Sequence, residues 1–128
     1  MFGIVPTRIH GFVDYLIGLA LVVMPFVLGR GAGPQTWLPV LLGGGLIVYS
    51  LLTESERGVV PLIGMPTHLV LDGLVGLFLA SSPWLLGFAY LVWVPHLILG
   101  LALVGLATIT QPMATRRTWD PASARISA

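Results

Sequence analysis

The chain has 128 residues, of which 56% are hydrophobic and 9% are charged, and its net charge is +1. Since an ordinary soluble domain carries about 25% charged residues, this composition excludes a soluble monomer and also a disordered chain. The small net charge gives no footprint for nucleic acid, and the lack of cysteine excludes disulfides, thiolate metal sites and cysteine nucleophiles.

Four apolar segments approach the length of about 20 residues that a helix needs to cross a bilayer. They are residues 10–28, 37–53, 67–87 and 90–109, of which the second is slightly short. Short connections, residues 29–36 and 88–89, join them in pairs, while a longer linker, residues 54–66, separates the pairs. We therefore predict an all-α membrane protein with four transmembrane helices arranged as two tandem helical hairpins.

The arginines indicate how these helices are oriented. With four spans, the N-terminus, the 54–66 linker and the C-terminal tail share one side of the membrane. That side carries five arginines, and the other side has only Arg30. The five are Arg8, Arg57, Arg116, Arg117 and Arg125. The positive-inside rule then predicts cytoplasmic termini, and Trp37 and Trp93 are expected to anchor the outer ends in the interface. Residues 1–110 would form the membrane domain and residues 111–128 a flexible cytoplasmic tail.

The sequence repeats itself, with units at residues 8–53 and 66–110. In the first helix of each unit the same residue types recur 58 positions apart, and in the second helix they recur 56 positions apart. The first set pairs His10 with His68, Asp14 with Asp72, Gly18 with Gly76 and Pro25 with Pro83; the second pairs Trp37 with Trp93, Pro39 with Pro95 and Gly44 with Gly100. Because each unit has two spans, the units enter the membrane in the same sense, which predicts a pseudo-two-fold axis along the membrane normal.

Helical periodicity places the repeated residues of each first helix on one face. Since a carboxylate in hydrocarbon is costly, such a stripe is expected to face the bundle interior. The glycines of the stripe, Gly18 and Gly76, would let helix backbones approach closely. At the outer end of the third segment, Ser82-Pro83-Trp84 has a structural interpretation: the proline ends or kinks the helix, the serine bonds back to a carbonyl and the tryptophan anchors the end.

Several of these motifs together resemble one protein family. Ser82-Pro83-Trp84, the opening stretch from Pro6 to Tyr15 and the repeated His-x3-Asp-x3-Gly pattern are similar to the SPW repeat family of small bacterial integral membrane proteins. The first unit departs from the pattern, with Met24-Pro25-Phe26 in place of Ser-Pro-Trp. The resemblance implies a protein of two units and four helices in the bacterial inner membrane, and it implies no established activity.

The pairs His10/Asp14 and His68/Asp72 are the main candidates for chemistry. An i,i+4 spacing puts both groups of a pair on one helix face. We favour a structural interpretation, in which hydrogen bonds between these groups tie helices together. The alternatives are a divalent metal site, a path for protons or ions and a haem held by the two histidines. No cofactor is predicted outright, and the sequence leaves open whether the two stripes meet within one chain.

These observations lead to three hypotheses for function. The leading one is a non-enzymatic integral membrane protein that acts through assembly, as a homo-oligomer or an accessory subunit of a larger complex. The second is a small transporter or channel for ions, protons or solutes, and the third is a metal- or haem-binding membrane protein. No complete catalytic constellation is found. The expected partners are membrane lipid and other membrane subunits or further copies of this chain, with no nucleic acid.

Overall fold

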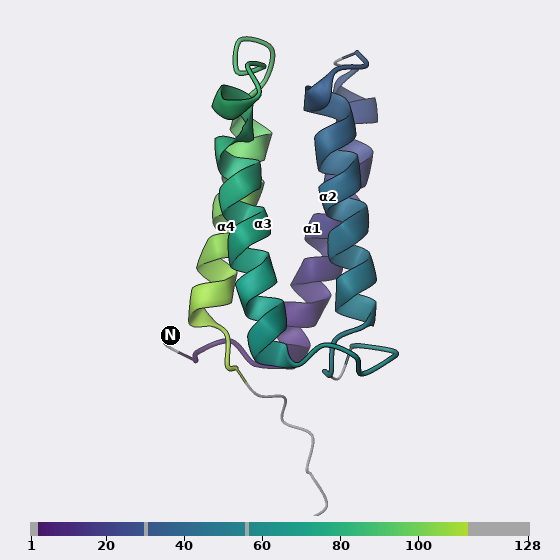
Figure 1. The fold of residues 1–128 in the computed structure, drawn as a ribbon, viewed down its shortest axis with the longest axis vertical. Coiled ribbons are helices and arrows are strands. Elements are labelled where there is room, and N and C mark those ends of the chain that lie inside the picture. Colours follow the sequence, from purple (N-terminus) through teal and green to yellow (C-terminus); the bar gives the residue numbers. More distant parts are fainter. Residues whose placement is uncertain (1–2, 30, 56, 113–128) are drawn as a thin grey trace, which may run out of the picture.

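The computed structural model describes residues 3–29, 31–55 and 57–112, and these form four helices (Figure 1). The helices are α1 (Thr7–Leu28), α2 (Pro34–Leu51), α3 (Met65–Leu85) and α4 (Val94–Ile109). The described residues contain no sheet, only two isolated bridges that join Val5 to Thr110 and Thr53 to Ile63. The predicted all-α class is therefore confirmed.

The helices pack as two antiparallel pairs, α1 with α2 and α3 with α4, and far fewer contacts join one pair to the other. In Figure 1 the two hairpins stand side by side and approach each other most closely at the end where the N-terminus and the linker before α3 lie. Each helix contributes one fully buried leucine to the core. These are Leu21, Leu46, Leu79 and Leu103.

Glycine backbones lie in direct contact within each hairpin. A Cβ atom added to Gly43 would lie 2.6 Å from the carbonyl oxygen of Gly18, and one added to Gly100 would lie 2.5 Å from that of Gly76. The counterpart of Gly100 is thus Gly43, and the predicted match with Gly44 is wrong by one position. Three consecutive glycines leave this register undecided in the sequence, and only the contact across the hairpin selects one of them.

The helix boundaries differ from the predicted segments in a systematic way. The first three helices begin two or three residues earlier than expected, because a proline lies at the start of each. The fourth begins at Val94 instead of Tyr90, and α3 ends at Leu85. The predicted connection, residues 88–89, is therefore the middle of a longer turn. The residues on either side of it, such as the buried Val92, are apolar and so have the hydropathy expected of a helix.

Two of the four helices are long and apolar enough to cross a membrane. These are α1, with a mean hydropathy of 2.1, and α3, with a mean hydropathy of 1.3. The α4 helix is apolar but has 16 residues. Large apolar side chains are exposed on every helix, as expected for surfaces in contact with lipid; examples are Phe26, Leu41, Leu77 and Leu101.

Two expectations concern residues that the structure does not describe. Of the predicted tail, only Gln111 and Pro112 fall within the described residues, and the main-chain N–H of Gln111 donates to the carbonyl of Val5. Arg30 and the tail arginines lie outside the described residues. The orientation derived from them stays a prediction.

Candidate functional site

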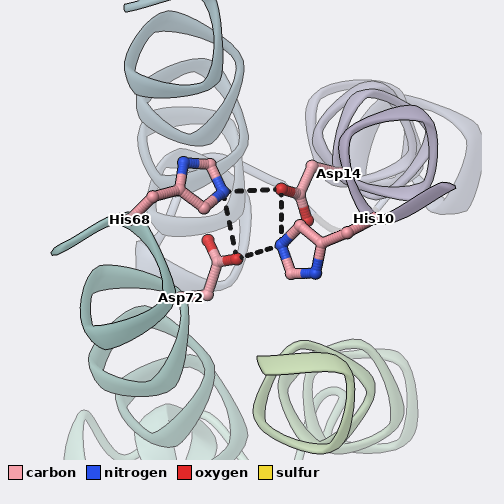
Figure 2. A group of neighbouring side chains, drawn as sticks. All are labelled: His10, Asp14, His68 and Asp72. Carbon is pink, nitrogen blue, oxygen red and sulfur yellow. Dashed lines mark hydrogen bonds and ion pairs between the residues drawn. The ribbon is translucent and has the colours of Figure 1, made fainter. Parts of the chain in front are cut away.

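Four side chains of the predicted stripes meet at one end of the bundle (Figure 2). His10 and Asp14 come from the first two turns of α1, and His68 and Asp72 come from the first two turns of α3. The side chains are 0–3% exposed. The two stripes therefore face each other within one chain, a point that the sequence left open. We call these four residues the His–Asp cluster.

The atoms of the His–Asp cluster alternate between nitrogen and oxygen. The Nε2 atom of His10 lies 2.7 Å from Oδ2 of Asp72 and 2.9 Å from Oδ2 of Asp14. The Nε2 atom of His68 lies 2.7 Å from Oδ2 of Asp14 and 3.2 Å from Oδ2 of Asp72. These four contacts close the ring drawn with dashed lines in Figure 2. Each histidine makes its shorter contact with the other helix, so the cluster joins the two hairpins.

Two threonines orient the imidazole rings from behind. The Nδ1 atom of His10 lies 2.7 Å from Oγ1 of Thr110, and the Nδ1 atom of His68 lies 2.6 Å from Oγ1 of Thr53. Each threonine follows the end of a helix, and its hydroxyl also donates to the main-chain carbonyl four residues earlier, in the last turns of α2 or α4. Because a hydroxyl has one proton to donate, its oxygen accepts from the imidazole, which places a proton on both Nδ1 atoms.

The sequence interpretation did not include these threonines. Thr53 and Thr110 are 57 positions apart, and so are Gly43 and Gly100. The offset of 56 that the tryptophans and prolines indicate does not align them. With the register taken from the glycine contacts, the threonines would have appeared as a further repeated pair at the end of each second helix.

One contact breaks the symmetry of the site. The hydroxyl of Tyr49 donates to Oδ1 of Asp72. The position that matches Tyr49 in the second unit, 57 residues later, is Leu106, which has no polar group in its side chain. The matching oxygen, Oδ1 of Asp14, is buried and has no hydrogen-bond partner among the described residues.

The linker between the hairpins runs across the start of α1, beside the cluster. The hydroxyl of Tyr15 donates to the carbonyl of Arg57 over 2.6 Å, and Nε of Arg57 donates to the carbonyl of Arg8 over 3.5 Å. The guanidinium of Arg57 lies 5.9 Å from the centre of the Phe12 ring. A cationic side chain thus lies against the first turns of α1, at the end of the molecule where the hairpins meet.

The Ser-Pro-Trp segment lies at the opposite end of α3 from the cluster. The hydroxyl of Ser82 donates to the carbonyl of Leu79 over 2.7 Å, as expected for a serine that bonds back into its helix. The helix ends two residues after Pro83, and Trp84 lies 5.9 Å from Trp93, ring centre to ring centre. Pro25 in the first unit behaves alike, since α1 ends three residues later at Leu28 and Gly29 caps it. Trp37 lies half exposed at the same end.

The His–Asp cluster has the donor set of a small metal site. Two imidazole nitrogens and two carboxylate oxygens lie within 4.8 Å of one another. Such a set suits a four-coordinate divalent ion, whose bonds to nitrogen and oxygen are about 2.0–2.2 Å long. A haem between the two histidines is not favoured, because each Nε2 atom already lies within 3.2 Å of both carboxylates.

The fold and the site together define a small helical protein built from two repeated hairpins that share one buried cluster. The family model of the SPW repeat domain matches residues 8–110. The chain belongs to the SPW repeat family, as its motifs indicated, and the match includes both hairpins and all four residues of the cluster. Comparisons with curated proteins and with solved structures found no match.

Proposed function

We propose that this protein is a four-span integral membrane protein that binds one divalent metal ion in the His–Asp cluster. The observation that carries the proposal is the convergence of two Nε2 and two Oδ2 atoms within 4.8 Å of one another. They belong to His10, Asp14, His68 and Asp72, which are almost completely buried.

The protonation of the histidines supports an ion between these atoms. Because the threonines hold a proton on each Nδ1, a neutral imidazole presents a bare nitrogen to the two carboxylates. Four atoms that carry lone pairs at such short distances require positive charge among them. One divalent ion balances the two carboxylates, and a neutral site is the least costly one to bury in hydrocarbon.

The alternative without a metal is a structural tie, in which both imidazoles are protonated and paired with the carboxylates. It uses the same contacts, so it has to be separated by experiment. The donor set also limits the ion. Two nitrogens and two oxygens suit Zn²⁺ or a similar transition metal, whereas Mg²⁺ and Ca²⁺ prefer six or more oxygen ligands.

Metal analysis of the protein purified from its own membranes in mild detergent tests the proposal. We expect about one transition-metal ion per chain, lost in the double variant Asp14→Asn/Asp72→Asn. The control is Ser81→Ala, which removes an exposed hydroxyl on α3 outside the cluster. A preparation that contains no metal and takes up neither Zn²⁺ nor Co²⁺ would contradict the proposal and favour the structural tie.

The same proposal places all four helices across a bacterial inner membrane, with the cluster and both termini on the cytoplasmic side. Supporting it, α2 and α4 run antiparallel to the two long apolar helices and expose apolar side chains. Because the chain has no cysteine, a single introduced cysteine can report on which side of the membrane its position lies. Tyr90→Cys should react with an impermeant reagent in intact cells, and Leu62→Cys should react only after permeabilisation. The reverse pattern would invert the orientation, and reaction at both would contradict it.

A second candidate function is assembly with other membrane subunits or with further copies of this chain. It is supported by glycines that are not packed against another helix of this chain. Cβ atoms at Gly44, Gly45 and Gly105 would meet nothing within 4 Å, unlike those at the glycines inside the hairpins. Small residues on an outer face let a further helix approach closely in a membrane. Native mass spectrometry of gently extracted protein tests this. Multiples of 13.7 kDa or additional subunits would support assembly, and a bare monomer would count against it.

A further inference from the structure

The two carboxylates of the His–Asp cluster have different surroundings, although their positions match in the repeat. Asp72 uses both oxygens: Oδ2 contacts the histidines, and Oδ1 accepts a hydrogen bond from Tyr49. Asp14 uses only Oδ2, and its Oδ1 is buried without a partner among the described residues. A buried acceptor that lacks a hydrogen bond is uncommon and calls for a specific explanation.

The difference comes down to one hydroxyl group. The main-chain carbonyls of Tyr49 and Leu106 are equivalent, because each accepts the hydroxyl of the threonine four residues later. Those two threonines in turn contact the two histidines in the same way. The repeat therefore holds for the histidines and threonines of the site, whereas the position that matches Tyr49 has a leucine, which carries no hydroxyl.

We propose that Oδ1 of Asp14 is a fifth metal ligand, so that Asp14 binds the ion through both oxygens while Asp72 binds through one. This inference rests on the proposed metal site and adds its coordination number. Carboxylates bind metals through one or two oxygens, and zinc sites expand from four to five ligands. The hydrogen bond from Tyr49 keeps Oδ1 of Asp72 away from the ion, because residues that hydrogen-bond to a metal ligand fix the orientation of that ligand. Asp14 has no such partner, so both of its oxygens stay available.

Absorption spectroscopy of the Co²⁺-loaded protein tests the assignment, since the visible bands of Co²⁺ strengthen and move to longer wavelength as ligands are lost. The wild-type protein should give a five-coordinate spectrum. Leu106→Tyr supplies the missing hydroxyl, and its spectrum should move to longer wavelength with higher molar absorbance, as expected for four ligands. Leu106→Phe, which adds the ring without the hydroxyl, is the matched control and should leave the spectrum as in the wild type.

A second variant tests the same inference independently, in case a larger side chain at position 106 disturbs the fold. Tyr49→Phe removes only the hydroxyl that holds Asp72. It should free the second oxygen of Asp72, weaken the Co²⁺ bands and move them to shorter wavelength. A four-coordinate wild-type spectrum would overturn the inference. So would a five-coordinate spectrum that Leu106→Tyr leaves unchanged, which would assign the fifth bond to water. Failure of the wild-type protein to bind Co²⁺ would instead overturn the proposed function itself.

Discussion

The two ends of this bundle use the internal repeat in opposite ways. At the cluster end, both units supply the same residue types, a histidine, an aspartate and a threonine. At the other end, one unit has Met24-Pro25-Phe26 where its partner has Ser82-Pro83-Trp84. The cluster is a single site to which both units contribute, so it requires the same chemistry twice. Each proline ends only its own helix, so the residues beside it are free to differ.

The ends also differ in what holds them together. Buried polar contacts join the two hairpins at the cluster end, whereas large apolar side chains are exposed at the other end, among them Phe26, Trp84 and Tyr90. A buried polar network depends on every member, because each unpaired group is costly. An exposed aromatic side chain at the membrane interface stabilises only its own surroundings. Substitutions should therefore have larger effects at the cluster end.

The largest effect is expected for Asp72→Leu. It removes one of two carboxylates, so that both buried histidines share Asp14 alone and the tyrosine hydroxyl loses its acceptor. Breaking a buried polar pair in this way costs about 3–5 kcal/mol. Thermal melting in detergent measures the loss, with Trp84→Leu at the other end of α3 as the control. Equal changes in melting temperature for both variants would contradict the difference between the ends.

Next is the pair Thr53→Val and Thr110→Val, which removes the hydroxyls behind the histidines. Loss of a partner that orients a metal ligand weakens metal binding by about 10–100-fold. Titration of the purified protein with Zn²⁺ measures the affinity. Thr108→Val is a matched control on α4, since its exposed hydroxyl contacts only its own helix. Unchanged affinity in both cluster variants would show that the threonines have no part in binding.

Within a hairpin, Gly43→Ala should be destabilising and Gly44→Ala should not. The new methyl group at position 43 would lie 2.6 Å from the carbonyl of Gly18 and force the helices apart. Such overpacking costs about 1–3 kcal/mol. At position 44 the methyl group meets nothing within 4 Å, and alanine favours the helix by about 1 kcal/mol over glycine. Melting curves in detergent compare the two, and a reversed order would refute the register described above.

The smallest effect is expected for Ser82→Ala, at the end remote from the cluster. The variant loses one hydrogen bond to the carbonyl of Leu79, a contact inside its own helix. The expected cost is about 1 kcal/mol or less, with no change in metal content. A loss of stability comparable to that of Asp72→Leu would show that the Ser-Pro-Trp segment does more than end a helix.

The sequence by itself determined the helical class, the two hairpins and the residues that share each polar face. These properties follow from hydropathy and from the helical period, which depend on neighbours a few positions apart. The recurrence of histidine and aspartate also identified the members of the site. The boundaries were less accurate in the turn from Leu86 to Trp93, because buried apolar residues in a turn have the same hydropathy as those in a helix.

Only the tertiary structure decided how these parts meet. The bond between His10 and Asp72 joins residues 62 positions apart, and that between His10 and Thr110 joins residues 100 positions apart. No local pattern specifies such contacts, since they depend on the packing of whole hairpins. The same packing selects Gly43 over Gly44 and sets Leu106 opposite to Tyr49 in the repeat. The fold therefore decides that Oδ1 of Asp72 has a hydrogen-bond partner and Oδ1 of Asp14 has none among the described residues.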